Sequence, residues 1–327
     1  MSGEALSFSR QLVIVDSRTI MEVKNKILDK SFLKKILSSK GAYLLLLPGM
    51  GLFFTFILFP LIYSLRMSFY KWNIVDISAS KFVGFSNYVR VINDPIFIRA
   101  TLNTIVYTLI TVPGQILFAL VVAILLNQKI KGRTFFRVAY YIPVITSWVI
   151  VTFLFEYLFG SQAGLVNFIL KDMLHLVDKK IMWLTDPILV MIPLNLLGIW
   201  KGVGWSAIII LAALQNIPPD LYEAAAIDGA GIWHKITKIT LPLIRPTLVF
   251  LVVVLTIGGF NVYISGLLMT KGGYPLDLSH FILTLMYKKT FTYLDFGYGS
   301  AISYLLAAFI FMVSVIQIKL LRRKVEY

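Results

Sequence analysis

The chain has 327 residues, of which 58% are hydrophobic and only 14% are charged. A soluble domain of this length carries more charge, so the composition indicates a membrane protein. There is no cysteine, which excludes disulfides, thiolate nucleophiles and cysteine-ligated metal sites. The three histidines have no metal-ligand spacing, so we predict no metal site. The net charge of +15 is spread over loops between apolar segments, which favours membrane topology over nucleic-acid binding.

Residues 1–40 form a polar tail of mixed charge. Its one sustained apolar run, residues 12–15, is far too short for the core of a signal peptide. The last part, residues 30–40, places apolar side chains on one face with lysines around them. This pattern predicts an interfacial helix on the membrane surface, and a solvated linker is the alternative.

Six charge-poor runs follow the tail, each close to the length of about 20 residues that crosses a bilayer. We therefore predict an all-α membrane protein with six transmembrane helices in one domain, residues 41–327. The fourth span is expected to be interrupted by WKGVGW, at Trp200 to Trp205. No internal repeat or second soluble domain is visible. The predicted spans cover residues 41–65, 100–128, 138–155, 187–214, 246–270 and 300–318.

The distribution of Lys and Arg sets the orientation. If both termini lie on one side of the membrane, that side carries more basic residues than the other. Because Lys and Arg are retained in the cytoplasm, both termini are predicted to be cytoplasmic in a multi-pass protein of the cell membrane. The connection between the fourth and fifth spans, about residues 215–246, is then cytoplasmic too.

That connection begins with strong helix signals. Pro218 and Pro219 end the preceding segment, and Asp220 followed by Glu223 is a capping-box pattern. A short helix is therefore predicted from Leu221.

Gly229 is the predicted turn residue after this helix. A second helical run is expected over residues 232–239, and Pro242 is expected to stop it. The connection should thus be a helix, a bend and a helix lying outside the membrane.

The spacing of small and polar residues in this connection is distinctive. It resembles the EAA loop in the membrane subunits of binding-protein-dependent ABC importers. Glu-Ala-Ala alone is merely good helix composition, whereas the full spacing between two apolar spans is specific. The matching residues are Glu223, Ala224, Ala225, Gly229, Ile239, Leu241 and Pro242.

Three further stretches are similar to the carbohydrate-uptake permeases, the subgroup that includes maltose and glycerol-phosphate importers. The resemblance implies a type I ABC importer permease fold (MetI-like) with a cytoplasmic coupling helix. It implies four kinds of neighbour: a homologous second permease, two ATPase subunits, an external substrate-binding protein and the bilayer. The chain lacks the large outer domain of some maltose-type permeases. The stretches are RTFFR followed by Pro143, WKGVGWSAIIILAALQNIPPDLYEAAAIDGA, and TKGGYPLDLS.

In this reading the loop contacts the ATPase, because two adjacent alanines leave a low-relief surface that fits a groove. The alternative is an ordinary amphipathic connector. The residues assigned to coupling are Glu223, Ala224, Ala225, Asp228 and Gly229.

No catalytic constellation is visible, and the sequence has no phosphate-binding loop of the GxxxxGK[ST] type. We therefore expect a non-enzymatic subunit that binds no cofactor, with ATP and Mg²⁺ used by partner subunits. The rival functions are a passive channel and an intramembrane enzyme. The sequence leaves the sugar open.

Polar and small residues at membrane depth are the candidates for the substrate pathway. The resemblance implies that spans flanking the EAA loop line this pathway. The alternative is helix packing, because glycines let helices approach and an Asn can bond to a neighbouring helix. The candidates are Lys201, Gly202, Trp205, Gly259, Asn261 and Tyr263.

Lys201 is the most unusual of these residues, since a cation at the centre of a span costs about 2.5 to 3.5 kcal/mol on insertion scales. No acid lies in the fifth span to neutralise it. We expect Lys201 to face the pathway, where it would donate hydrogen bonds to sugar hydroxyls or attract an acidic cargo. An ion pair with the second permease is the alternative.

Overall fold

The computed structural model describes residues 40–128 and 131–321. Residues 1–39, which hold the predicted tail and almost all of its interfacial segment, lie outside this part. The chain divides into two compact units, residues 1–63 and 64–327.

The described part of the first unit is a long apolar helix. It consists of α3 (Lys40–Phe53), the π-helical segment η2 (Phe54–Leu58) and the start of α4 (Phe59–Ser68). Residues 43–68 have the length and hydropathy of a membrane span, which confirms the predicted first span. The π segment lies just before Pro60, which lacks the N–H that a regular α-helical ladder needs there.

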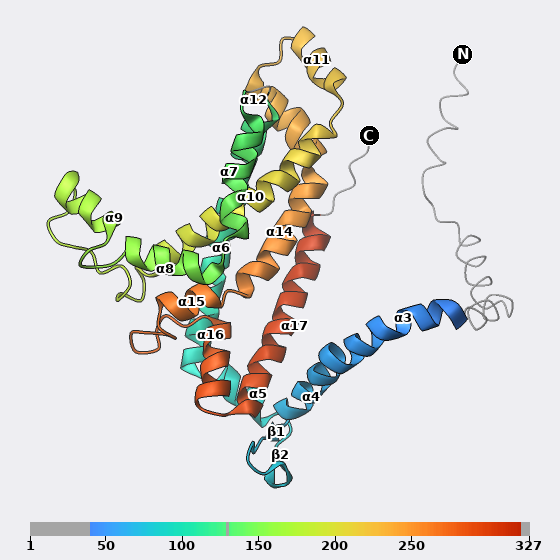
Figure 1. The fold of residues 1–327 in the computed structure, drawn as a ribbon, viewed down its shortest axis with the longest axis vertical. Coiled ribbons are helices and arrows are strands. Elements are labelled where there is room, and N and C mark those ends of the chain that lie inside the picture. The colour runs from blue at the N-terminus through green and yellow to red at the C-terminus, as the bar shows by residue number, and fades with distance from the viewer. Residues whose placement is uncertain (1–39, 129–130, 322–327) are drawn as a thin grey trace. The chain divides into compact units, whose positions relative to one another are not determined.

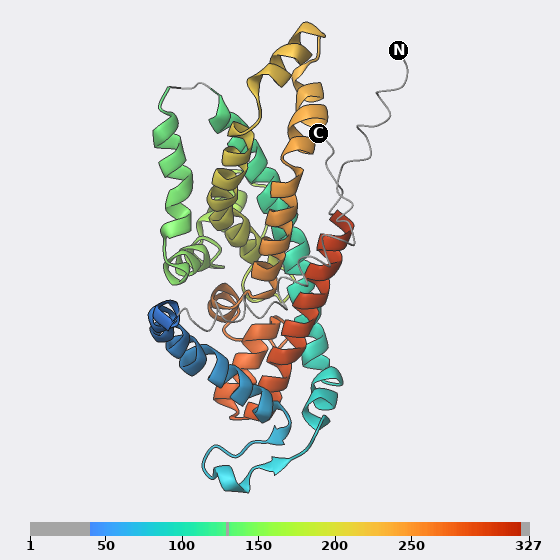
Figure 2. The same ribbon diagram turned by 90° about the vertical axis from the view of Figure 1, so that its right-hand side faces the viewer.

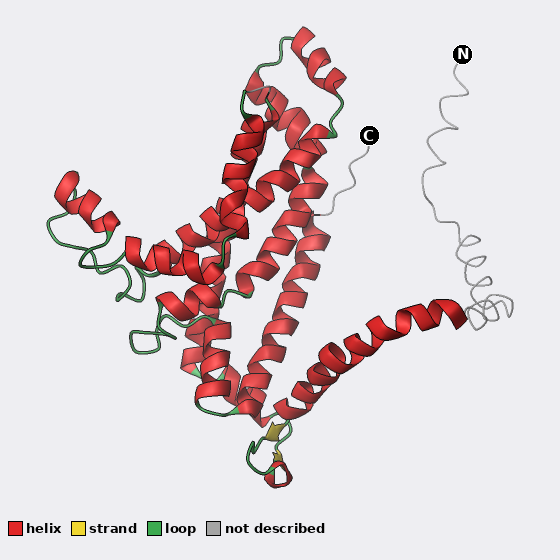
Figure 3. Ribbon diagram, viewed as in Figure 1, coloured by secondary structure: helices red, strands yellow, loops and turns green. Residues whose placement is uncertain are grey.

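The second unit is mostly helical, with several long loops, as Figure 3 shows. Its few strand residues form one antiparallel hairpin, which pairs Tyr70 with Phe82. In Figures 1 and 2 this hairpin and helix α11 lie at opposite ends of the unit. The elements are β1 (Tyr70–Lys71), η3 (Ile77–Ala79), β2 (Lys81–Phe82), α5 (Ser86–Ile92), α6 (Pro95–Asn127), α7 (Arg133–Ile145), α8 (Trp148–Leu158), α9 (Leu165–Asn167), η4 (Phe168–Met173), α10 (Met191–Gln215), α11 (Pro219–Ile227), α12 (Ile232–Lys235), η5 (Ile236–Thr240), α13 (Leu241–Leu243), α14 (Arg245–Phe260), α15 (Ile264–Met269), α16 (Ile282–Tyr287), η6 (Lys288–Thr292) and α17 (Phe296–Leu321).

Helix α6 is the longest of the described elements. The side chain of Asp94 accepts a hydrogen bond from the backbone N–H of Ile96 at 2.8 Å, and Pro95 takes the first helical position. Both are favoured helix-start residues. Helices α10 and α14 pack along α6, and their buried apolar side chains form a common cluster.

The predicted third span is two helices, so the expectation of one uninterrupted helix over residues 138–155 is wrong. Helix α7 ends at Ile145, α8 begins at Trp148, and the two axes meet at a bend of 94°. Thr146 and Ser147 have extended backbone at the break. The Thr146 hydroxyl donates to the carbonyl of Ile142 at 2.8 Å, a local bond that competes with helix continuation. Among the described residues, five long helices and this bent pair give up to six spans.

The predicted fourth span is a continuous helix, so the interruption expected at WKGVGW is also wrong. Its glycines do not break α10, because they lie where other groups approach it closely. A Cβ atom on Gly204 would lie 2.0 Å from the backbone oxygen of Tyr140 in α7. On Gly202 it would lie 2.2 Å from the side-chain oxygen of Gln115 in α6. The packing interpretation of these glycines is therefore supported.

The fifth span has the predicted position but is not one regular helix. Helix α14 ends at Phe260, residues 261–263 are non-helical, and α15 follows. Residues 245–269 together have the length and hydropathy of a span. The sixth predicted span corresponds to α17, which runs a few residues further at each end.

The segment after α15 is tied to α6. The side-chain amide of Asn103 donates to the backbone oxygens of Leu278 and His280, at 2.8 and 2.9 Å. The His280 ring is fully buried and lies 3.1 Å from the Thr284 hydroxyl and 3.2 Å from an Asp277 carboxylate oxygen. Burial lowers the pKa of His280, although the neighbouring Asp277 carboxylate opposes this effect.

Candidate functional site

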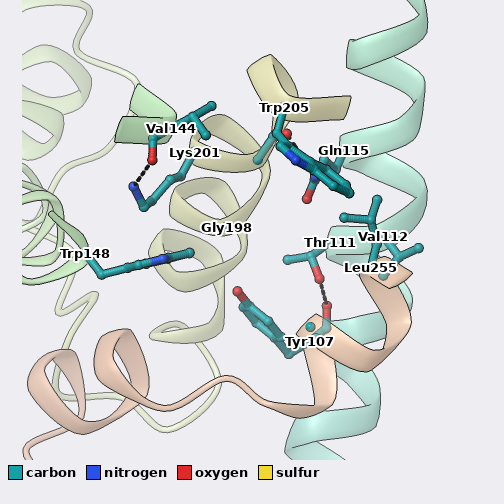
Figure 4. Close-up of a pocket in the computed structure, with 13 residues that line it drawn as sticks. Tyr107, Thr111, Val112, Gln115, Val144, Trp148, Gly198, Lys201, Trp205 and Leu255 are labelled. Carbon is teal, nitrogen blue, oxygen red and sulfur yellow. Dashed lines mark hydrogen bonds between the residues drawn. The ribbon is translucent and has the colours of Figure 1, made fainter. Parts of the chain in front are cut away.

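A pocket of about 250 Å³ lies where α6, α7, α8, α10 and α14 meet. Its wall combines aromatic rings, hydroxyl and amide groups, one lysine and four glycines (Figure 4). The volume lies just below the ~300 to 1,000 Å³ typical of small-molecule sites. The lining residues are Tyr107, Thr111, Val112, Gln115, Val144, Trp148, Gly198, Lys201, Gly202, Trp205, Leu255, Gly258 and Gly259.

The polar side of the pocket comes from one face of α6. Tyr107, Thr111 and Gln115 recur every four residues, which places them on the same face of the helix. All three are buried. The Gln115 amide donates to the backbone oxygen of Gly202 at 2.9 Å and to the Ser206 hydroxyl at 2.8 Å. These bonds join α6 to α10 and fix the amide in the pocket wall.

Glycines in α10 and α14 make room for this polar face. A Cβ atom on Gly198 would lie 2.4 Å from the Tyr107 hydroxyl oxygen, so only glycine fits there without a shift. Gly259 similarly faces Thr108, at 2.8 Å. Gly258 differs, because a Cβ atom at this position would meet nothing within 4 Å. It therefore lines the pocket with open space in front of it.

Lys201 reaches from α10 to the end of α7. Its ammonium donates to the backbone oxygens of Pro143 at 2.8 Å, Val144 at 3.4 Å and Thr146 at 2.6 Å. It also lies 4.9 Å from the centre of the Trp148 ring, a cation–π distance. The side chain is 4% exposed, and Figure 4 shows it extended toward Val144. All three ammonium donors therefore point at backbone carbonyls.

At one end of the unit, the segment between α10 and α14 forms the predicted helix, bend and helix (Figure 1). The first helix is α11, and Gly229 follows it with φ of +76°, in the left-handed region that glycine tolerates. The N–H of Ala230 bonds to the oxygen of Ala225, and that of Gly229 to the oxygen of Ala226. This pair of bonds is a Schellman motif, which requires the left-handed residue.

Two details of this segment differ from the sequence predictions. The capping box is absent, because Pro218 is the N-cap, α11 begins at Pro219, and no side chain caps it. Asp220 lies inside the first turn instead, where its charge favours the helix dipole. Pro242 does not stop the second helical run, which continues to Leu243. The π-helical segment η5 lies just before this proline, and its altered hydrogen-bond spacing accommodates the residue without an N–H.

The bend of this segment is exposed. Glu223, Ala224 and Asp228 lie at the surface and Ala225 is half-buried. Around them, Ile227, Ile232 and Trp233 are 76 to 87% exposed. Large apolar side chains this open, next to polar residues, are typical of a surface that a partner covers.

Comparison with known proteins identifies the family of this chain. Residues 92–326 match the family model described as the binding-protein-dependent transport system inner membrane component. The chain belongs to this family. It is a multi-pass membrane protein with the type I importer permease fold, as the sequence predicts.

Relatives of this permease carry sugar-transport names. It is 35% identical to the arabinooligosaccharides transport system permease protein AraP of Bacillus subtilis, over 86% of this chain and 89% of AraP. It is 33% identical to the sulfoquinovosyl glycerol transport system permease protein SmoG of Agrobacterium fabrum, over 86% of this chain and 91% of SmoG. These matches confirm the resemblance to carbohydrate-uptake permeases.

The permease also resembles a solved structure, a bacterial ABC transporter involved in the import of the acidic polysaccharide alginate. The TM-score is 0.78 at 26% identity, covering 91% of this chain and all of the compared chain. A second structure, of an alginate ABC transporter with a pentasaccharide-bound periplasmic protein, gives 0.75 at 26% identity. It covers 89% of this chain and 96% of that one.

The permease brings four of the six predicted pathway residues into one pocket, namely Lys201, Gly202, Trp205 and Gly259. Asn261 and Tyr263 are not among its lining residues. The Asn261 amide donates to the oxygen of Ile257, and the Tyr263 ring packs against Tyr287.

Sequence reasoning missed the face of α6 and the first residue of α8. Tyr107, Thr111 and Gln115 stand four residues apart in an otherwise apolar span, a spacing that gives a polar face on a helix. That spacing could have predicted the polar face. Nothing in the sequence predicts the position of Trp148, because it depends on the break between α7 and α8. Among the described residues, no three His, Asp or Glu side chains are grouped as metal ligands.

Proposed function

We propose that this permease forms half of the membrane pathway for a sugar, an oligosaccharide or a sugar derivative. The pocket carries the proposal: Tyr107, Trp148 and Trp205 supply flat apolar rings, and Gln115 and Tyr107 supply polar groups. Sugar rings have apolar CH faces and hydroxyl edges, which such a wall can contact. The transport names of AraP and SmoG support the same cargo class.

The contacts offered to cargo are mainly uncharged. Lys201 is the only Lys, Arg, Asp or Glu among the lining residues, and its donors are directed at carbonyls. In the relatives whose names include an acidic cargo, the acidic groups would then be bound by residues outside this pocket, in particular by residues of the second permease. We propose that this chain recognises hydroxyl groups, whether or not the cargo also carries an acid.

We propose that the α11 segment is the coupling element that a cytoplasmic ATPase subunit contacts. Glu223, Ala224, Ala225, Asp228 and Gly229 lie on or beside its exposed bend. The Tyr222 hydroxyl lies 2.9 Å from the Thr240 hydroxyl, which ties α11 to η5 and thus to the start of α14. A push on the bend would therefore reach a helix that lines the pocket.

In the complete transporter we propose a homologous second permease, two ATPase subunits and an external substrate-binding protein. The periplasmic protein in the alginate transporter complex supports the last of these. Both termini would lie in the cytoplasm. ATP and Mg²⁺ would be used by the ATPase subunits, and this chain would bind no cofactor itself.

The test uses Tyr107, whose hydroxyl has no hydrogen bond to any of the described residues. Tyr107→Phe removes that hydroxyl and keeps the ring. Losing one neutral hydrogen bond to cargo costs about 0.5 to 1.5 kcal/mol, so the half-saturating sugar concentration should rise roughly 2- to 12-fold. The half-saturating concentration is measured as uptake of labelled arabino-oligosaccharides and other sugars into vesicles that contain the full complex. Tyr263→Phe, outside the pocket, is the control, and equal uptake by both variants would contradict the proposal.

A further inference from the structure

The break between α7 and α8 exposes carbonyl groups inside the protein. The last carbonyls of any α-helix have no partner within that helix. At the end of α7, the oxygen of Ile142 accepts from the N–H and the hydroxyl of Thr146. The oxygens of Pro143, Val144 and Thr146 still need donors. Helix α8 does not supply them, because it turns away by 94° and does not continue the hydrogen bonds of α7.

Lys201 supplies the donors for these three oxygens. It comes from a different helix, α10, and places a positive charge at the negative end of the α7 dipole. No ion pair joins Lys201 to a carboxylate among the described residues. Its charge is therefore balanced mainly by the helix end and by the Trp148 ring.

Close backbone packing holds α7 beside this lysine. Gly204 stands three residues after Lys201 and so lies on a similar face of α10. It lets the backbone oxygen of Tyr140 approach α10 more closely than any Cβ atom would allow. The α7 helix is thus held at two points, by contact at Gly204 and by hydrogen bonds at Lys201.

We propose that Lys201 is a positioning residue that fixes the break between α7 and α8 and thereby places Trp148 in the pocket wall. Trp148 is the first residue of α8, so the direction of α8 decides where its ring lies. Without the ammonium, the freed carbonyls gain most by resuming helical pairing, which would straighten α7 and α8. The link to transport rests on the proposed function, whereas the effect on the bend does not.

The bend can be measured by distance, and the absence of cysteine makes site-specific labelling direct. Phe135 in α7 and Tyr157 in α8 are 72% and 68% exposed, so cysteines there can carry spin labels without disturbing the core. At 1.5 Å per residue, their backbones are about 33 Å apart in a straight helix and about 22 Å apart at the observed bend. A difference of about 11 Å is well resolved by pulsed electron resonance.

The full-length double-cysteine chain in lipid nanodiscs is compared with its Lys201→Met, Lys201→Arg and Lys179→Met versions. Lys179 is exposed and controls for loss of a lysine elsewhere. We expect Lys201→Met to broaden the distances and shift them toward the longer value. Lys201→Arg, which keeps charge and donors, and Lys179→Met should match the parent. If the Met variant cannot be recovered in membranes, Lys201→Gln is measured in the same way and should shift similarly but less.

An unchanged distance distribution in the Met or Gln variant would overturn the proposal, as would an equal shift in the Arg variant. These measurements need no cargo, ATP or partner subunit, so their outcome is separate from that of the proposed function. Unchanged distances combined with lost sugar uptake would assign Lys201 to direct contact with cargo.

Discussion

Gly229 is the residue at which the coupling assignment can be tested most sharply. Its φ of +76° costs a residue with a Cβ atom about 1 to 2 kcal/mol, and a β-branched side chain more. The alternative for Gly229→Val is to open the Schellman motif. That loses two hydrogen bonds, together worth about 1 to 3 kcal/mol. Because these costs are similar, the Val variant should populate loops in which α11 and α12 no longer keep their relative orientation.

The spans should not be affected, because a Cβ atom at Gly229 would meet nothing within 4 Å. We therefore expect Gly229→Val to insert normally into the membrane and to lose sugar uptake. Gly229→Asn is the matched control, since Asn tolerates the left-handed region, and Gly229→Ala should be intermediate. Uptake by vesicles and co-purification of the ATPase subunits are the two measurements. If the Val variant kept both, the assignment of this loop to coupling would be wrong.

Three further outcomes are expected. The purified chain without partners should not hydrolyse ATP, and activity that persisted after removal of contaminating ATPases would contradict this. Gly258→Phe should block uptake without loss of folded protein, because the added ring enters open pocket space; uptake at the parent rate would show that the pathway lies elsewhere. Thermal stability should fall as the pH drops below about 6.5, because the unfolded chain binds a proton at His280 while burial keeps its pKa lower in the folded chain. In His280→Gln this part of the pH dependence should disappear, and an unchanged profile would assign it to other groups.

The spans and the helix-bend-helix connection after α10 could be predicted from sequence because their signals are local. A charge-free run of sufficient length predicts a span. A glycine such as Gly229 after a short helix predicts a turn, because glycine adopts left-handed backbone without strain. The 94° break at Thr146 and Ser147 could not be predicted, since hydropathy averages over it. It depends on donors from Lys201, which is more than fifty residues away along the chain.

Errors over glycine and proline have the same origin. Both residues weaken an isolated helix, which led to the predicted interruption of α10 and the predicted stop at Pro242. In the folded chain, Gln115 and the α7 backbone approach α10 closely at its glycines. This close packing offsets the low helix propensity of glycine. Pro242 is accommodated by η5. Asn261 and Tyr263 were assigned to the pathway because they are polar groups in a span next to the EAA-like loop, and they do not line this pocket.

The bond between Tyr222 and Thr240 has a mechanical consequence. It ties the two arms of the loop together on either side of Gly229. In the proposed coupling, a sideways displacement of α11 would therefore be passed on as a tilt of α14. That helix has 16 residues and is about 24 Å long, so a tilt of about 5° would move its far end by about 2 Å. Leu255, Gly258 and Gly259 lie toward that far end, where such a movement is sufficient to change the width of the pocket.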